Sequence, residues 1–295
     1  MNALQNALSR VSSPRRPSRL VVESLVRSAL LEDLAHGSDL TTDAIVPTDL
    51  HATAAVVARE EGVIAGMWAA LLAFELLDPG AGKVHVIVDD GCTVAAGAKV
   101  AEITGRARTL LTGERTMLNL LCRLSGIATA THRMVDAIRG TAAQIVDTRK
   151  TTPGLRTLEK YAVRCGGGSN HRFGLDDAVL IKDNHLALAG SIHEAVARAR
   201  ALAGHMVKVE VEVDTLDQLR EALDEPIDAV LLDNMSPAQL AQAVEIVNHR
   251  VITEASGGIR PETVRAVAES GVDLISVGWL THGAPAMDLG LDITV

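Results

Sequence analysis

The sequence is short of aromatic side chains, which make up only 2% of its 295 residues. A nucleotide or an aromatic ligand could stack on only two tryptophans, one tyrosine and two phenylalanines, so recognition must depend on charge and hydrogen bonds. The scarcity of aromatics and the net charge of −9 argue against general nucleic-acid binding. No apolar run reaches the roughly 18 residues of a membrane span, so no membrane segment is expected.

Cysteine is also scarce. Cys92, Cys122 and Cys165 are far apart and form no Cys-x-x-Cys pair, so neither a disulfide framework nor a zinc site is expected. A reducing compartment fits this usage, and we expect a cytoplasmic protein. Cys165 lies beside three glycines and is interpreted as a small loop residue rather than a nucleophile.

The first 19 residues contain four arginines, two prolines and no acidic residue. They lack the apolar core of a secretory signal. We interpret residues 1–19 as a disordered leader, with an organelle-targeting segment as the alternative.

Residues 20–125 are predicted to form an α+β module. The pattern predicts a helix over 20–31, a break at 39–43 and a helix over 66–77. Short runs with alternating polarity predict strands, at 54–59, 63–65, 83–88 and 99–103. Residues 107–139 then read as two apolar helices, with Ser125 as the N-cap of the second.

After residue 140 the pattern alternates between strand and helix. Apolar runs predict six strands, at 143–147, 178–182, 206–213, 228–233, 251–255 and 273–277. Helical periodicity predicts four helices, at 191–203, 215–224, 236–248 and 261–270, the last two with Pro237 and Pro261 at the first turn. Such alternation indicates a parallel sheet with right-handed crossovers. An incomplete barrel and a doubly wound sheet both fit six strands.

Basic side chains gather where two of these strands end. Only six of the 28 basic residues are lysines, and three of those lie between residues 148 and 185. Arg149 and Lys150 end one apolar run, and Lys182 ends another. An acidic protein that places cations at strand ends is predicted to bind a multiply charged anion; solvated surface charges are the alternative.

The later strands end in acids and then in glycines. Glu212 and Asp233 end neighbouring predicted strands and suit Mg²⁺ or ribose hydroxyls, unless they only balance Lys182 and Lys208. Glu210 lies two residues before Glu212 on the same predicted strand, so its side chain is expected on the same face, pointing into the barrel mouth. The turn Ser256-Gly257-Gly258, with Gly278 after the last strand, predicts a phosphate site; two tight turns are the alternative.

The guanidinium groups of Arg149 and Arg172, with His171, suit a planar dicarboxylate. Arg115 lies near the predicted start of a helix, where the dipole disfavours a cation, so it needs another partner. An ordinary salt bridge to Glu114 or Glu102 is the alternative.

Seven sequence words, in one order, resemble the quinolinate phosphoribosyltransferase family. They are Glu-Arg-Thr-Met-Leu-Asn (114–119), Thr-Arg-Lys-Thr-Thr-Pro-Gly (148–154), Gly-Gly-Ser-Asn-His-Arg (167–172), Ile-Lys-Asp-Asn-His (181–185), Glu-Val-Glu-Val (210–213), Leu-Leu-Asp-Asn-Met (231–235) and Glu-Ala-Ser-Gly-Gly-Ile (254–259). The resemblance implies an α/β fold: an N-terminal α/β sandwich over 20–125 and an incomplete β/α barrel over 126–284. The tail, 285–295, would return to the N-terminal domain.

The resemblance also implies an activity, the transfer of phosphoribosyl from phosphoribosyl pyrophosphate to quinolinate with loss of CO₂. It implies quinolinate contacts from Arg115, Thr148, Arg149, Lys150, His171, Arg172 and Lys182. It implies phosphate contacts from Ser256, Gly257, Gly258, Ser276 and Gly278. Lys150, Lys182, Glu212 and Asp233 would be catalytic, with Mg²⁺ at the last two. The family further implies a homodimer in which Arg115 enters the neighbouring subunit's pocket.

Three rival functions remain at this point. A Schiff-base aldolase would use Lys182 as its nucleophile but leave the other cations unexplained. A catalytically silent relative would only bind a phosphorylated metabolite. A related transferase would act on another acid such as nicotinate, which lacks the second carboxylate.

Overall fold

The computed structural model describes residues 14–34, 37–80 and 82–294. The predicted leader therefore lies largely outside the described residues. The chain divides into two compact units that interleave along the sequence. Unit 1 comprises Met1–His132, Thr152–Gly167 and Ala284–Val295, and unit 2 comprises Arg133–Thr151 and Gly168–Gly283. Unit 2 ends at Gly283, next to the predicted boundary at 284, and the chain then returns to unit 1; the predicted boundary at 125 lies within unit 1, which continues to His132.

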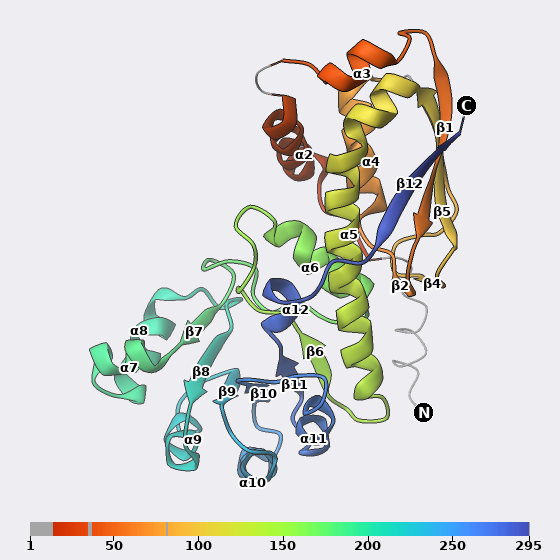
Figure 1. Ribbon diagram of the computed structural model, residues 1–295. Helices are drawn as coiled ribbons and strands as arrows, with labels where there is room; N and C mark the ends of the chain where they lie inside the picture. Colours follow the sequence, from red (N-terminus) through yellow and green to blue (C-terminus); the bar gives the residue numbers. More distant parts are fainter. Residues whose placement is uncertain (1–13, 35–36, 81, 295) are drawn as a thin grey trace. The chain divides into compact units, whose positions relative to one another are not determined.

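Unit 1 contains an antiparallel sheet in the order β12-β1-β5-β3 (Figure 1). Its strands are β1 (His51–Ala58), β3 (Lys83–Val86), β5 (Lys99–Arg106) and β12 (Leu289–Thr294), beside a small pair of β2 (Gly62–Val63) and β4 (Thr93–Val94). Alternate residues of β1 are buried, the period of a strand with one face on a core. The pairing of β12 with β1 places the last strand of the chain in the sheet of the first unit.

The helices assigned wholly or mostly to unit 1 include two, α3 and α6, that no pattern predicted. The full set is α2 (Arg19–Leu34), α3 (Leu40–Ile45), α4 (Met67–Leu77), α5 (Ala107–Ala137) and α6 (Arg156–Cys165). The break predicted at 39–43 is wrong, because the Asp39 side chain accepts from the Thr42 N–H at 3.0 Å and caps α3. Cys165 ends α6 and is not a loop residue.

The two helices predicted over 107–139 are one continuous helix, α5, so the predicted N-cap at Ser125 is wrong. Ser125 is buried, and its hydroxyl accepts from the Ala65 N–H at 3.1 Å. A Cβ at the next residue, Gly126, would lie 2.0 Å from the Pro285 carbonyl oxygen. Ser125 and Gly126 therefore allow close packing inside a helix here, and the sequence pattern alone cannot distinguish this use from a helix cap. No helix among residues 14–34, 37–80 and 82–294 is long and apolar enough to cross a membrane.

Unit 2 contains a parallel sheet in the order β6-β11-β10-β9-β8-β7. The six strands are β6 (Gln144–Val146), β7 (Val179–Ile181), β8 (Val209–Val213), β9 (Ala229–Asp233), β10 (Ile252–Ser256) and β11 (Leu274–Ser276). All six predicted strands are confirmed. The first strand pairs with the last, as in a closing barrel, while β6 and β7 do not pair with each other. This is the incomplete barrel, not the doubly wound sheet.

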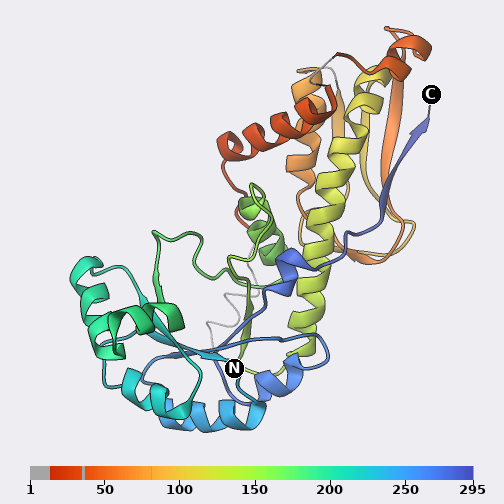
Figure 2. The same cartoon turned by 60° about the vertical axis from the view of Figure 1, so that its left-hand side comes forward.

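The connecting helices are α7 (Asp183–Ala189), α8 (Ile192–Leu202), α9 (Leu216–Ala222), α10 (Pro237–Val247), α11 (Val264–Glu269) and α12 (Trp279–His282). Figure 2 shows α8 to α11 along one side of the curved sheet. Pro237 is the first residue of α10, as predicted, behind the N-cap Ser236. The start predicted at Pro261 is wrong: residues 261–263 form a turn, and α11 begins at Val264.

Candidate active site

A cavity of about 400 Å³ lies in unit 2, and residues at the carboxyl ends of its strands line it. This is the face on which β/α barrels form their active sites. The lining residues are Thr148, Arg149, Lys150, His171, Arg172, Leu180, Lys182, Glu212, Leu231, Asp233, Glu254, Ser256 and Ser276. The convergence of these strand-end residues, predicted from the sequence, is therefore present in the fold. Of the predicted site residues, Arg115, Gly257, Gly258 and Gly278 are not in this lining.

The backbone of Lys150 is held by its own loop and by α12. Its N–H donates to the Thr148 hydroxyl at 3.0 Å, and its carbonyl oxygen accepts from the Thr281 hydroxyl at 2.7 Å. A Cβ at Gly278 would lie 2.9 Å from Cδ of Lys150 and 3.4 Å from the Thr148 hydroxyl oxygen. Glycine at 278 thus leaves room for the lysine stem against the backbone that follows β11.

Arg172 is partly buried near a second cation. Its Nη1 donates to the Ala178 carbonyl at 3.0 Å. Burial, with the Arg149 charge adding to it, lowers the pKa of Arg172. An anion bound beside Arg172 would offset both its burial and the nearby charge of Arg149. The pair therefore favours an anionic ligand.

The carboxylates of the cavity contact both a lysine and an amide. Lys182 Nζ is ion-paired with Glu212, and Asp233 Oδ2 accepts from the Asn234 amide at 2.6 Å. The ion pair of Glu212 with Lys182 is the one expected if this acid balances the charge of that lysine. Glu210 does not join Lys208; it faces His171, with 3.2 Å between its Oε2 and Nε2 of the imidazole.

Glu254 is a cavity residue that the sequence analysis missed. Its Oε1 lies 3.4 Å from His171 Nε2, and the residue is 2% exposed. Burial first, and then the Glu210 charge, raise the pKa of Glu254 to about 7, while His171 opposes the shift. A signal was available: Glu254 has the parity of Ser256 on the same strand, so both face one side.

The glycines that follow β10 line a neighbouring hollow of about 310 Å³ rather than the main cavity. Gly257 has φ +100°, and a Cβ there would lie 2.2 Å from Asn234 Oδ1. Gly258 has φ +58°, and no atom of the described residues lies within 4 Å of where its Cβ would be, so a small side chain there meets no clash. Ser256 lines both spaces and joins them.

Arg115 belongs to unit 1 and is exposed on α5. It is the ninth residue of that helix, so the argument from the dipole of the first turn is wrong. Among the described residues no ion pair links Arg115 to Glu114 or Glu102, and Glu102 pairs with Lys99 at 2.9 Å. The salt-bridge alternative for Arg115 therefore finds no support.

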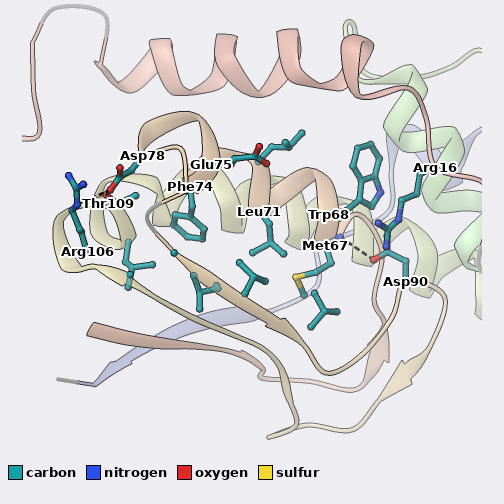
Figure 3. A pocket seen from close by; sticks show the side chains of 18 of the residues that line it. Arg16, Met67, Trp68, Leu71, Phe74, Glu75, Asp78, Asp90, Arg106 and Thr109 are labelled. Atoms are coloured by element: carbon teal, nitrogen blue, oxygen red, sulfur yellow. Dashed lines mark hydrogen bonds and ion pairs between the residues drawn. The ribbon is translucent and has the colours of Figure 1, made fainter. Parts of the chain in front are cut away.

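A larger cavity of about 510 Å³ lies in unit 1 under α4 (Figure 3). Its wall is largely apolar, and Asp78 at its rim is ion-paired with Arg106 at 3.2 Å. Asp90 accepts from the Tyr161 hydroxyl at 2.7 Å and from the Met67 N–H at 3.1 Å. None of the predicted site residues lines this cavity, so its size does not make it the chemical centre.

Cys165 lies in unit 1 and is buried. Burial, with the Asp90 charge adding to it, raises the pKa of the Cys165 thiol to about 12. A thiol that holds its proton so firmly is a poor nucleophile. This agrees with the sequence interpretation that Cys165 is not catalytic.

Both halves of the chain match family models. Residues 39–125 match the model of the quinolinate phosphoribosyl transferase N-terminal domain, and residues 127–292 match that of the C-terminal domain. Together the two models span most of the chain.

Whole-length relatives carry matching names. The chain is 48% identical over 272 residues to a carboxylating nicotinate-nucleotide pyrophosphorylase of Mycobacterium leprae, covering 91% of this chain and 95% of that one. It is 45% identical over 278 residues to a probable enzyme of the same name from Bacillus subtilis, covering 94% and 95%. The solved structure of the nicotinate-nucleotide pyrophosphorylase from Francisella tularensis superposes with a TM-score of 0.91 at 41% identity, over 97% of this chain and 100% of that one.

Proposed function

Because this chain belongs to the quinolinate phosphoribosyltransferase family, it is a phosphoribosyltransferase of NAD biosynthesis, and we propose how the strand-end cavity performs its reaction. The reaction is that of a carboxylating nicotinate-nucleotide pyrophosphorylase. Phosphoribosyl pyrophosphate and quinolinate give nicotinate mononucleotide, pyrophosphate and CO₂. The observation that best supports the proposal is the pair Arg149 and Arg172 in one cavity with two lysines and three carboxylates.

Quinolinate binds through its adjacent carboxylates. Guanidinium groups offer a planar fork to a carboxylate, and burial together with the Arg149 charge lowers the pKa of Arg172, which a bound carboxylate would offset. Thr148, His171, Lys150 and Lys182 complete the pocket. We place Arg115 there too, from the neighbouring subunit of a cytoplasmic homodimer.

The phosphate of the co-substrate binds near the last two strands. Ser256 and Ser276 supply hydroxyls, and Gly257, Gly258 and Gly278 supply backbone N–H groups. The positive φ values at Gly257 and Gly258 support this, because such turns direct N–H groups into one concavity.

Glu212 and Asp233 fit a Mg²⁺ ion. Both line the cavity from adjacent parallel strands, and carboxylate oxygens are the ligands that this ion prefers. When bound there, Mg²⁺ would neutralise charge on the pyrophosphate group.

The chain's own residues carry the chemistry as follows. The ring nitrogen of quinolinate displaces pyrophosphate from C1 of the ribose, and Lys150 and Lys182 balance charge on the leaving group. Glu212 and Asp233 stabilise the cationic charge that develops at C1. The ring nitrogen is then cationic, so it stabilises the carbanion that remains at C2 when the 2-carboxylate leaves as CO₂, and C2 then takes up a proton from solvent to give nicotinate mononucleotide. No covalent enzyme intermediate is required.

The test is product release from two acids. With quinolinate, pyrophosphate and CO₂ should appear in equal amounts; with nicotinate, turnover should be absent. Equal turnover of both acids would contradict the proposal that the cavity recognises two adjacent carboxylates. Trapping by borohydride with a carbonyl substrate would instead indicate an aldolase acting through Lys182.

Removal of divalent metal should abolish activity. Dialysis against EDTA should bring turnover of quinolinate to background, and Mg²⁺ should restore it, because the carboxylates of Glu212 and Asp233 otherwise repel pyrophosphate. Full activity in EDTA would exclude the metal role.

Gly258→Asp should raise the KM for phosphoribosyl pyrophosphate by about tenfold or more, because a carboxylate would face the 5′-phosphate. Position 258 is the better test site, since a side chain at 257 would clash with Asn234. Gly258→Asn is the matched control, because asparagine tolerates the same positive φ without the charge. An unchanged KM for phosphoribosyl pyrophosphate in the aspartate variant would show that the 5′-phosphate does not bind at Gly258.

A further inference from the structure

Two buried acids contact the imidazole of His171 and have no part in the proposed chemistry. Glu210 extends from β8 and Glu254 from β10, with β9 between them in the sheet. They are 8% and 2% exposed. Their carboxylates lie 3.2 Å and 3.4 Å from the same atom, His171 Nε2. Burying two carboxyl groups beside a pocket for anions costs free energy unless a polar partner compensates them there.

The opposite edge of the imidazole defines its tautomer. The backbone N–H of Arg172 donates to His171 Nδ1 at 2.6 Å. Nδ1 therefore offers its lone pair, and in the neutral ring the proton is on Nε2. Nε2–H then faces the two acids, whose nearest carboxyl oxygens lie 3.2 Å and 3.4 Å away.

This assignment excludes the simplest alternative use of the cluster. His171, Glu210 and Glu254 bring ligand atoms within 4.8 Å of one another, close enough to hold a metal ion. A metal would need the lone pair of Nε2. With Nδ1 accepting from Arg172, Nε2 carries the proton of the neutral ring, so it presents an N–H to the two carboxyl groups and has no lone pair for a metal.

The backbone of the same segment is anchored separately. The N–H of His171 donates to Asp147 Oδ1 at 2.9 Å, and the Asn170 amide donates to Asp147 Oδ2 at 2.6 Å. Asp147 is fully buried after β6. Backbone and ring are thus both anchored immediately before Arg172, so the anchors determine where its guanidinium group points.

We propose that Glu210 and Glu254 are positioning residues, which hold His171 through Nε2 and thereby orient Arg172 for the carboxylates of quinolinate. The proposal rests on the proposed function of the cavity. The raised pKa of Glu254 agrees with it, because a protonated Glu254 avoids a second buried negative charge next to Glu210.

The test compares Glu254→Gln with Glu254→Leu. Glutamine keeps a polar oxygen facing Nε2–H, whereas leucine keeps only the bulk. The leucine variant should raise the KM for quinolinate by about tenfold or more, with the KM for phosphoribosyl pyrophosphate nearly unchanged, and glutamine should restore most of the loss. The matched control is Glu225→Gln, which alters a half-buried acid paired with the exposed His193 (2.9 Å) and should change neither constant.

A second readout does not depend on turnover. In enzyme labelled with ¹⁵N-histidine, the His171 signal, identified by its loss in His171→Gln, should show a protonated Nε2 and an unprotonated Nδ1. In Glu254→Leu that pattern should weaken towards a mixture of tautomers. Thermal melting of both Glu254 variants shows whether they fold.

Several outcomes would overturn the proposal. A folded Glu254→Leu with an unchanged KM for quinolinate, or with equal rises for both substrates, removes the positioning role. So does a His171 that is protonated on Nδ1, or Zn²⁺ binding that Glu254→Gln abolishes. If the wild type does not use quinolinate, the proposed function fails by itself, while the histidine spectra still decide whether the acids hold the ring.

Discussion

Arg172→Lys should lower kcat/KM for quinolinate by about 10- to 100-fold, although the charge at this position is kept. Arg172 already donates one N–H to the Ala178 carbonyl, and its remaining donors form a fork that lysine lacks. A charge-assisted bond of this kind contributes about 1.5–3 kcal/mol, which corresponds to that range. Steady-state kinetics with varied quinolinate and saturating co-substrate would measure it.

The matched control for this prediction is Arg198→Lys. Arg198 is exposed on α8 and pairs with Glu194 one turn away at 2.7 Å, an interaction that contributes little. The control should keep wild-type kinetics. If Arg172→Lys also stayed near wild type, bidentate recognition by this arginine would be refuted.

Mixing two inactive variants should return about a quarter of wild-type activity. Arg115→Ala and Arg149→Ala should each be almost inactive as homodimers, because each removes a proposed carboxylate ligand from both sites. If Arg115 acts in the partner's cavity, a mixed dimer has one site with both arginines and one with neither. Random pairing makes about half of the dimers mixed, with one active site in each.

The result depends on which subunit Arg115 serves. If it served its own subunit, each site of a mixed dimer would still lack one arginine, and mixing would restore nothing. Arg149→Ala with Arg172→Ala is the control, because both side chains line the same cavity and no mixed dimer regains a full site. Activity measured after joint refolding, against each variant refolded alone, distinguishes these cases.

The barrel unit was predictable from the sequence because parallel strands are buried on both faces. They read as apolar runs, and the polar residues that end them mark the edge where a site forms. All six strands and the cavity positions of Arg149, Lys182 and Glu212 follow from that pattern. The closing of the sheet did not follow, since the pairing of β6 with β11 joins strands far apart in the chain.

The first unit was harder to predict, for a physical reason visible at Ser125 and Gly126. Local chemistry there indicates a helix cap, but the buried hydroxyl bonds to Ala65 and the missing Cβ admits residue 285. Both partners are distant in sequence. Arg115 was misplaced for a different reason: it was expected near a helix start, whereas it is the ninth residue of α5.

Taken by itself, the sequence determined the strand periods, the acidic balance and the collection of cations at strand ends, because these depend on residue type and spacing along the chain. Tertiary structure alone decided which atoms meet. Glu210 and Glu254 reach one imidazole because β8, β9 and β10 lie side by side, and the Nδ1 contact to Arg172 then sets the tautomer. Hydrogen bonds between residues far apart in the chain leave no period in the sequence, so only the folded chain reveals them.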